Sequence, residues 1–557
     1  MNNMKLSGSQ IIMEVLLEHG VDTVFGYPGG AALNVYDELY KYQDKIHHVL
    51  TAHEQGASHA ADGYARATGK TGVVFATSGP GATNLVTGIA TAMLDSIPMI
   101  AITCNVSSNA IGRDAFQEVS ITGVTLPITK HNYFVNKIED LADAIRNAFR
   151  IANEGRKGPV LIDITKDVTD PNNLYEYKKQ KPLPLTKSPT ASDSQLQEIA
   201  QIMNEAKRPV IYYGGGVNAS HAQKELNELI EKYDCPATYT LMGAGAVRYD
   251  NPKNLGLIGM HGSMQANIAI DNADLVIALG TRFSDRVALN PRKFAKHAGI
   301  IQIDIDESEI NKNVLINYQV IGDIKEVLSS LLPLIDKTKH KDWIDECHKA
   351  HKWVDIELQG AKLRPRDIIE ATCTMTDKET IYVTDVGQHQ MWAAQYVHHI
   401  KSENFLTSGG LGTMGYGYGA AIGAQFGQPE KRVIHFTGDG SFHMNLNECC
   451  TAVSNELPII TIIFDNKVLG MVYQWQTAFY GKRYSNTTPG RKTNYPKLAE
   501  GFGATGFEVN TLDEFKEAFS KALKINGPVW IACNILKEER VLPMIPNGGT
   551  VSDMIIK

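Results

Sequence analysis

Short apolar runs alternate with stretches of helical periodicity along most of the 557-residue chain. Apolar runs of this length, bounded by Gly, Pro or Asp, are typical of strands that are buried on both faces. Their alternation with helices predicts mostly parallel sheets flanked by helices, so the predicted fold class is α/β. The predicted strands include 73–76, 99–103, 160–164, 209–214, 273–280, 299–304, 381–384, 433–437 and 458–464.

Two polar stretches divide this alternation into three successive units. The first, from about 170 to 193, is rich in Lys, Pro, Asn, Ser and Thr and is predicted to be a linker. The second runs from about 337 to 362. Length also favours several domains, because single cores rarely grow beyond about 250–300 residues. We therefore predict three domains, covering 1–170, 190–345 and 363–557.

Composition narrows the function classes. The net charge of −7 and the absence of a long basic run argue against nucleic acid as the main partner. No apolar run reaches the length of a membrane span, and Met1 to Ser7 lacks the regions of a signal peptide, so we expect a cytoplasmic protein without a membrane partner. The seven cysteines form no CxxC pair, which favours reduced core thiols over disulfides or zinc.

The segment Gly438 to Ser441, followed by Asn466, is the most informative chemical pattern. Asp439 follows one predicted strand and Asn466 follows the next, with a predicted helix at 442–453 between them. The carboxyl ends of parallel strands bind ligands in open α/β sheets, and a helix amino terminus beside Ser441 favours an anion. Mg²⁺ takes oxygen ligands and commonly keeps some from a phosphate. The pattern predicts a metal and diphosphate site, although Gly-Asp-Gly alone is often only a turn.

With Asn466 at this spacing, the segment resembles the thiamine diphosphate motif of the decarboxylase and carboligase superfamily. The resemblance implies that Mg²⁺ is bound by Asp439, Asn466 and the backbone carbonyl of Val468. It also implies that Met414 wedges the cofactor into a bent shape. The remaining implied contacts to thiamine diphosphate are Val386, Gly387, Gln388, His389, Gly438, Gly440 and Ser441. The family often has a second Asn where this chain has Asp465, whose role stays open.

Glu54 precedes a predicted helix, and spacing alone would make it a capping or solvated carboxylate. The resemblance instead matches it to the glutamate that hydrogen-bonds to the pyrimidine ring of the cofactor and drives its activation. A carboxyl group in that role has to lie in a pocket of low polarity, because desolvation favours the neutral acid. In the superfamily this glutamate faces the metal motif of another subunit, so the resemblance implies a homodimer or homotetramer.

Four further strings narrow the resemblance: 25–31, 114–118, 165–168 and 471–476. Together, and over essentially the whole chain, they look like the catalytic subunit of acetolactate synthase. That family decarboxylates pyruvate and ligates the hydroxyethyl group to a second pyruvate or to 2-ketobutyrate, the first common step of branched-chain (isoleucine and valine) amino acid biosynthesis. The implied catalytic and access residues are Gly30, Phe116, Gln117 and Lys166, and the implied acceptor-specificity residues are Met471, Val472 and Trp475.

The middle unit contains glycine-rich turns at 214–216, 259–262 and 280–286, each a weak nucleotide signal by itself. Their order resembles the FAD-binding domain of biosynthetic acetolactate synthases. The resemblance thus implies a pyrimidine-binding first domain, a Rossmann-like FAD-binding middle domain, and a diphosphate- and Mg²⁺-binding third domain with a C-terminal lid. The implied FAD contacts are Gly214, Gly215, Gly216, Thr240, Leu241, Gly259, Met260, His261, Gly280, Arg282, Arg286, Asp304 and Asp323.

Several alternatives stay open at this point. A pyruvate oxidase-like flavin oxidoreductase shares the same domains, and catabolic acetolactate synthases lack FAD. A non-catalytic paralogue is disfavoured because Glu54, Asp439 and Asn466 are all present. Ser284 replaces an acidic residue and Ser107 a proline that are frequent in the family, which leaves flavin affinity and inhibitor binding open. The preferred acceptor and a small regulatory subunit are also undetermined.

Overall fold

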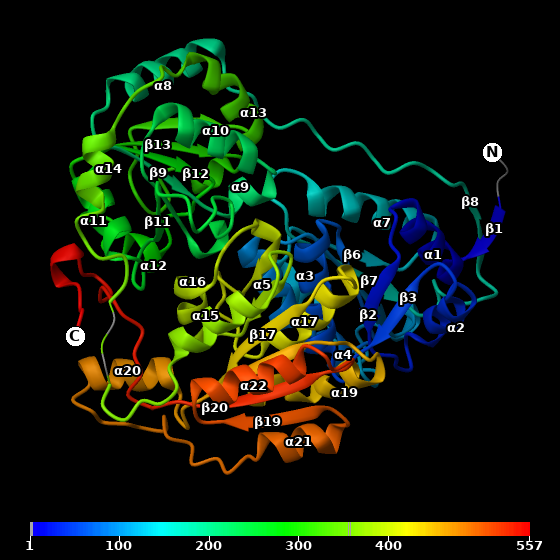
Figure 1. Ribbon diagram of the computed structural model, residues 1–557. Coiled ribbons are helices and arrows are strands. Elements are labelled where there is room, and N and C mark those ends of the chain that lie inside the picture. Colours follow the sequence, from blue (N-terminus) through cyan, green and yellow to red (C-terminus); the bar gives the residue numbers. More distant parts are fainter. Residues whose placement is uncertain (1–3, 355, 357) are drawn as a thin grey trace.

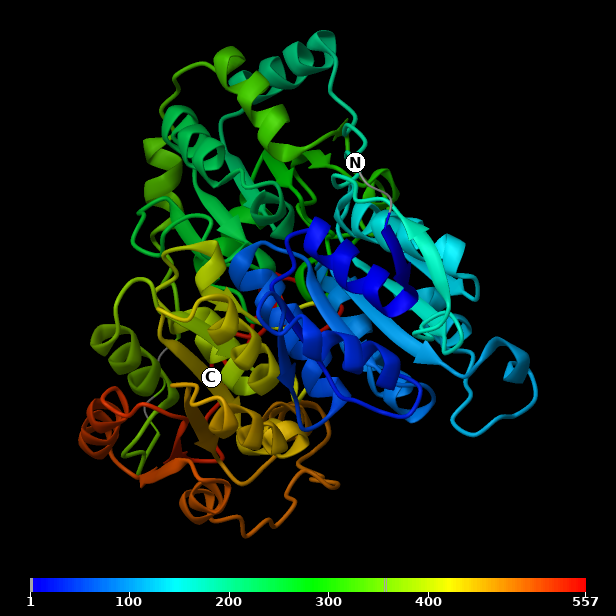
Figure 2. The same cartoon turned by 90° about the vertical axis from the view of Figure 1, so that its right-hand side faces the viewer.

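The computed structural model describes residues 4–354, 356 and 358–557, and within them three six-stranded sheets, each entirely parallel, form the framework (Figure 1). The predicted α/β class with helix-flanked parallel sheets is confirmed. Residues 1–3 of the predicted first domain, and 355 and 357 of the second polar stretch, lie outside the described residues. Figure 2 shows the first domain beside the third, with the middle domain above them.

The sheet of the first domain has the strand order β3-β2-β4-β5-β7-β6. Every residue of β5 and β7 is buried, as expected for strands covered on both faces. Its strands are β2 (Thr23–Gly26), β3 (His47–Leu50), β4 (Gly72–Ala76), β5 (Met99–Asn105), β6 (His131–Val135) and β7 (Pro159–Thr165). Its helices are α1 (Gly8–Glu18), α2 (Leu33–Lys41), α3 (Glu54–Thr68), α4 (Pro80–Asn84), α5 (Val86–Asp95), α6 (Ile121–Thr125) and α7 (Ile138–Asn153).

The predicted linker at 170–193 is only partly a linker. It contains β8 (Leu174–Tyr177), which pairs in antiparallel fashion with β1 (Met4–Ser7). Tyr177 explains this pairing, because its buried side chain donates a hydrogen bond to Glu18 at 2.5 Å. The rest of the segment runs across the molecule to the middle domain (Figure 1).

The sheet of the middle domain has the order β11-β10-β9-β12-β13-β14. Its strands are β9 (Pro209–Tyr213), β10 (Ala237–Tyr239), β11 (Asn254–Leu257), β12 (Leu275–Leu279), β13 (Gly299–Asp304) and β14 (Tyr318–Ile321). Its helices are α8 (Asp193–Glu205), α9 (Gly215–Ala219), α10 (Gln223–Tyr233), α11 (Met264–Asn272), α12 (Asp285–Ala288), α13 (Ile324–Leu331) and α14 (Lys341–Cys347). Helix α14 lies in the second polar stretch because Trp343 is buried and donates to the carbonyl of Pro209 at 3.0 Å.

The sheet of the third domain has the order β16-β15-β17-β18-β20-β19. Its strands are β15 (Ile381–Thr384), β16 (Phe405–Leu406), β17 (Val433–Gly438), β18 (Ile460–Asp465), β19 (Thr505–Val509) and β20 (Val529–Asn534). Its helices are α15 (Pro365–Met375), α16 (Gln388–Tyr396), α17 (Tyr416–Gly427), α18 (Asp439–Asn445), α19 (Cys449–Ser454), α20 (Gly470–Phe479), α21 (Tyr495–Phe502) and α22 (Leu512–Ala522).

The predicted helix at 442–453 is wrong in its bounds and continuity. Helix α18 already begins at Asp439, and a 3-10 turn at Leu446–Glu448 separates it from α19. Side-chain bonds to distant segments fix this break: Asn445 donates to the Gly415 carbonyl at 2.8 Å, and Glu448 accepts the amides of Ala52 and His53. Periodicity could not indicate these long-range bonds.

Helices α3 and α17 join the first domain to the third. A Cβ placed on Gly63 would lie 2.1 Å from the Ala420 carbonyl oxygen, and one on Gly423 would lie 1.8 Å from that of Ala60. Only glycine allows two backbones to approach so closely. Because α3 begins at Glu54 and α17 follows Met414, this packing fixes the position of both site segments relative to the core.

The C-terminal segment after β20 crosses from the third domain to the middle domain (Figure 1). It closes on itself through a bridge between Met544 and Ile555, and Ile545 donates its amide to the Met260 carbonyl at 2.8 Å. Met544 packs in a small apolar cluster with Met260, and Trp475 lies against this cluster. The C-terminal segment thus packs against α20 through Trp475.

Candidate active site

Asp439 and Asn466 lie at the same edge of the third sheet. Strands β17 and β18 are hydrogen-bonded neighbours, with Gly438 opposite Phe464, so their carboxyl ends bring the two buried side chains together. Val468 follows directly, and its amide donates to Asn466 Oδ1 at 3.2 Å. The structure therefore groups the three residues that the sequence assigned to the metal.

The electrostatics at this edge suit a cation. Burial, and then the neighbouring Asp465 carboxylate, raise the pKa of Asp439 to about 7. A divalent ion would relieve both effects, because it compensates the desolvated charge. Asp465 is itself buried and pairs with Lys467, while its Oδ1 has no hydrogen-bond partner. The described residues contain no group of three or more His, Cys, Asp and Glu able to hold a metal.

His389 and the start of α16 supply the anion-facing side. Burial lowers the pKa of His389 to about 4, so its ring is neutral at pH 7, and Nε2 is buried without a partner. A Cβ on Gly438 would lie 2.8 Å from His389 Nδ1, which explains the need for glycine there. Val386 and Gly387 precede α16, whose amino terminus favours negative charge. These features fit a diphosphate.

A chain of buried side-chain amides links Asn466 to α20. Asn466 Nδ2 donates to Gln388 Oε1 at 3.2 Å, and Gln388 Nε2 donates to Gln474 Oε1 at 2.9 Å. Gln474 continues to the C-terminal segment through both backbone groups of Val541. Gln474 lies within the string 471–476, and these bonds make it a structural support for α20.

Met414 lies beside the Gly-Asp-Gly segment. Its Cε is 3.9 Å from the position that a Cβ on Gly440 would take. The following residue, Gly415, donates its amide to Ser441 Oγ at 3.0 Å, so the loop that carries Met414 is attached to α18. The structure therefore places Met414, Gly440 and Ser441 together.

Glu54 is buried at the start of α3, 9% exposed, and accepts a hydrogen bond from Asn84 at 2.9 Å. A Cβ on Gly81 would lie 3.1 Å from its Oε1, so the glycine-rich turn covers the carboxylate. Glu448, which sequence reasoning missed, fixes the backbone ahead of it by accepting the amides of Ala52 and His53 at 3.1 Å each. No local signal in the sequence distinguishes Glu448.

Of the other residues predicted for the first domain, Gly30, Phe116 and Lys166 are exposed and Gln117 is half-buried. Gly30, Gln117 and Lys166 follow β2, β5 and β7, and the ring of Phe116 is 87% exposed. Gln117 has a positive φ of 60°, and a Cβ on Gly79 would touch its carbonyl. Among the described residues, no hydrogen bond or ion pair joins these four to Asp439 or Asn466.

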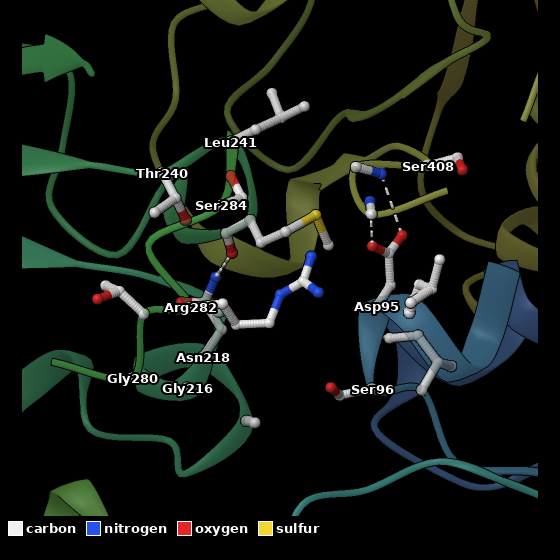
Figure 3. A pocket seen from close by; sticks show the side chains of 18 of the residues that line it. Asp95, Ser96, Gly216, Asn218, Thr240, Leu241, Gly280, Arg282, Ser284 and Ser408 are labelled. Carbon is white, nitrogen blue, oxygen red and sulfur yellow. Dashed lines mark hydrogen bonds between the residues drawn. The ribbon is translucent and has the colours of Figure 1, made fainter. Parts of the chain in front are cut away.

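A cavity of about 1970 Å³ lies where the three domains meet (Figure 3). Met471, Val472 and Trp475 line it, as do Val386 and Gly387. Most of the residues predicted for FAD also line the cavity; Gly214 and Gly259 do not, and they lie in the neighbouring loops. The lining residues are Gly215, Gly216, Thr240, Leu241, Met260, His261, Gly280, Arg282, Arg286, Asp304 and Asp323. The Arg282 side chain reaches from the middle-domain wall into the cavity (Figure 3).

The cavity wall fits a dinucleotide. A Cβ on Gly216 would lie 2.6 Å from Gly280 Cα, so these glycines let two strand-end loops pack against each other. Asn218 Oδ1 and His261 Nδ1 are buried beside the cavity without partners. Burial raises the pKa of Asp304 to about 6, and Asp323 caps α13 by accepting the Lys325 amide at 2.9 Å. Ser284 also lines the wall.

The first domain contributes cationic residues that the sequence did not single out. Arg156 lines the cavity, pairs with Glu309 at 2.6 Å and donates to Ser96 Oγ at 2.8 Å. Lys157 lies near Asp323, although burial lowers the pKa of its ammonium. Both residues come from the loop after α7, so only the packing of the first domain on the second reveals them.

Three family models match the chain in order. They are described as the N-terminal TPP binding domain, the central domain and the C-terminal TPP binding domain of thiamine pyrophosphate enzymes, at residues 6–124, 196–331 and 385–533. Fold and site together define a three-domain thiamine diphosphate-dependent enzyme.

Curated relatives narrow this class. The chain is 43% identical to the acetolactate synthase large subunit of Porphyra purpurea, over 99% of this chain and 95% of that protein. It is 43% identical to the probable acetolactate synthase large subunit of Methanocaldococcus jannaschii, with the same coverage, and 42% identical to the Escherichia coli isozyme 2 large subunit, over 99% and 100%. The chain belongs to the acetolactate synthase large-subunit family, which confirms the resemblance of its motifs.

No helix in the described part is both long and apolar enough to cross a bilayer. All seven cysteines are free, and only Cys450 is exposed.

Proposed function

We propose that the protein catalyses the acetolactate synthase reaction: it decarboxylates pyruvate and joins the two-carbon remainder to the ketone of a second 2-keto acid. The observation that carries this proposal is the shared cavity, in which Trp475, Met471 and Val472 lie with Val386 and Gly387 of the diphosphate motif. A bulky indole at such a site can select between acceptors that differ by one methylene. Pyruvate yields 2-acetolactate, and 2-ketobutyrate yields 2-aceto-2-hydroxybutyrate.

The cofactors that fit are thiamine diphosphate, Mg²⁺ and FAD. Asp439, Asn466 and the Val468 carbonyl would hold Mg²⁺, while His389 Nε2 and the amides that begin α16 would meet the diphosphate. Thiamine diphosphate, when bound, supplies the electron sink for decarboxylation. Met414 would support it from below, and Arg282 and Arg286 would meet the phosphates of FAD.

The residues of the first domain would act on substrate bound by a partner subunit. Glu54 would hold and return a proton at the pyrimidine nitrogen, because it is buried beside Gly81 and Asn84. Gln117 and Gly30 would contact the substrate, and Lys166 would attract its carboxylate while Phe116 excludes water. The exposure of Gly30, Phe116 and Lys166 in the single chain supports a homodimer or a homotetramer. A cytoplasmic enzyme that binds a small regulatory subunit is consistent with family membership.

The direct test measures products from pyruvate alone and with 2-ketobutyrate, leaving out thiamine diphosphate, Mg²⁺ or FAD in turn. We expect acetolactate only when thiamine diphosphate and Mg²⁺ are both present. Oxygen uptake driven by pyruvate without acetolactate would replace this proposal with an oxidase. Full activity in protein free of flavin would indicate the FAD-independent type.

Replacing Trp475 by Leu should reduce the preference for 2-ketobutyrate over pyruvate by tens-fold, because an aromatic wall around one methylene contributes about 1–3 kcal/mol. Competition between the two acceptors measures this ratio. Phe479→Leu is the matched control, since its ring packs 5.4 Å from Trp475 but does not line the cavity. An unchanged ratio in Trp475→Leu would refute the specificity role.

Arg282→Gln should weaken FAD binding by about 10- to 100-fold, because a charge-assisted hydrogen bond contributes about 1.5–3 kcal/mol. Flavin absorbance per subunit after dialysis, followed by titration with FAD, measures the effect. Arg292→Gln serves as the control, since Arg292 is exposed and does not line the cavity. Equal flavin content in the two variants would exclude Arg282 as a phosphate contact.

A further inference from the structure

The loop at 407–415 lies between the large cavity and the thiamine motif. Ser408, Gly409 and Gly412 line the cavity at one end of the loop. At its other end Met414 lies beside Gly440. A loop with glycines at 409, 410, 412 and 415 has little conformational preference of its own, so its shape has to be imposed by neighbours.

The first domain holds this loop by hydrogen bonds at four positions, 407, 409, 410 and 413. Asp95, at the end of α5, accepts the amides of Gly409 and Gly410 at 3.1 and 2.6 Å, and Figure 3 shows its carboxylate turned to these two nitrogens. Arg66 donates to the Thr407 carbonyl at 3.0 Å. Thr91 and Thr413 share a hydrogen bond of 2.7 Å between their hydroxyls.

The bonds from Asp95 to the loop require a carboxylate at this position. The side chains of Asp95 and Asp62 are fully buried, and Arg66 pairs with both, at 2.8 and 2.6 Å. A buried carboxylate is stable only when its acceptor sites are filled, and here the guanidinium and two backbone amides fill them. An asparagine would place an NH₂ group, which cannot accept, against one of these donors. Steric fit also matters, because a Cβ on Gly410 would lie 2.8 Å from Asp95 Oδ1.

We propose that Asp95 is a positioning residue that couples the flavin cavity to the thiamine site. Asp95 holds the loop backbone at Gly409 and Gly410. A dinucleotide in the cavity would contact one side of this loop, and Met414 lies on its other side. Each cofactor then binds more tightly when the other is bound, and by linkage the two effects are equal. This inference rests on the proposed function, since it requires both cofactors.

The test measures the Kd of thiamine diphosphate with saturating Mg²⁺, by quenching of tryptophan fluorescence, in flavin-depleted and FAD-saturated full-length protein. For the wild type we expect FAD to lower this Kd by about 5-fold or more, within the usual range of site coupling. In Asp95→Asn the ratio of the two Kd values should fall to about one while both cofactors still bind. This ratio does not respond to a uniform loss of stability.

Asp140→Asn, at an exposed position in the first turn of α7, is the control and should keep the wild-type ratio. Thr413→Val removes only the bond to Thr91 and should lower the ratio in part, which provides a second test if Asp95→Asn folds poorly. A wild-type ratio in both variants, or no coupling in the wild type, would overturn the inference. Failure of the wild type to bind FAD at all would instead refute the flavin part of the proposed function.

Discussion

The Glu54→Gln variant is expected to form acetolactate about 100- to 10,000-fold more slowly than the wild type, the usual contribution of a positioned acid or base. Glutamine keeps the size of the side chain and can still accept the hydrogen bond from Asn84, but it cannot share a proton. The fold should therefore persist. Steady-state product formation and thermal melting followed by circular dichroism separate the two effects.

Glu198→Gln is the matched control, because Glu198 is an exposed carboxylate on α8 in the middle domain. It should leave both rate and melting temperature unchanged. Near-normal turnover by Glu54→Gln would show that Glu54 is only part of the buried packing at the start of α3. A loss of rate accompanied by a lower melting temperature would point to a structural role.

The Asp439→Asn variant is expected to lose Mg²⁺-dependent binding of thiamine diphosphate. Asp439 is the only carboxylate in the predicted ligand set. The variant should therefore lose more metal affinity than the factor of about 10 to 100 that is typical when a residue supporting a metal ligand is replaced. Adding both cofactors should raise the melting temperature of the wild type, because ligands stabilise the state that binds them, but not that of the variant. Isothermal titration with Mg²⁺ and thiamine diphosphate gives the affinity directly.

Without cofactors, the same substitution should remove a pH-dependent loss of stability that the wild type shows. The pKa of Asp439 in the folded protein, about 7, exceeds its ordinary value of 3.8, so the folded state holds a proton that the unfolded state releases between these pH values. Metal-free wild type should therefore lose stability as the pH rises from about 4 to 7, and Asp439→Asn should lack this component. Asp513→Asn, at an exposed position of α22, is the control. Equal affinity and equal pH dependence in both variants would contradict the assignment.

Local pattern predicted much of the fold. The predicted strand 433–437 corresponds to β17 at Val433–Gly438, and 381–384 to β15, because apolar runs covered on both faces are recognisable without any knowledge of their neighbours. The helix at 442–453 was wrong in its bounds and continuity, and the linker at 170–193 was only partly correct. In both places one side chain, Glu448 or Tyr177, makes a bond to a segment far away in the chain.

The residues of the candidate site also fall into those that the sequence could predict and those that only the packing of the domains revealed. Asp439 and Asn466 could be paired from the sequence, since parallel neighbouring strands bring their carboxyl ends to one edge. Arg156 and Lys157 could not be found, because they reach the cavity only through the packing of the first domain against the middle domain. The same holds for Asp95 and its bonds to Gly409 and Gly410.

The sequence by itself determined the α/β class, the order of three parallel-sheet units and the residue types of a metal and diphosphate motif. These depend on short-range periodicity and on glycines and carboxylates at strand ends. Only the tertiary structure decided which groups share one cavity, which lie at the surface, and how the Met414 loop is held. Those properties depend on buried hydrogen bonds and ion pairs between residues hundreds of positions apart, such as Asp95 and Gly410, whose energies exist only once the domains have packed.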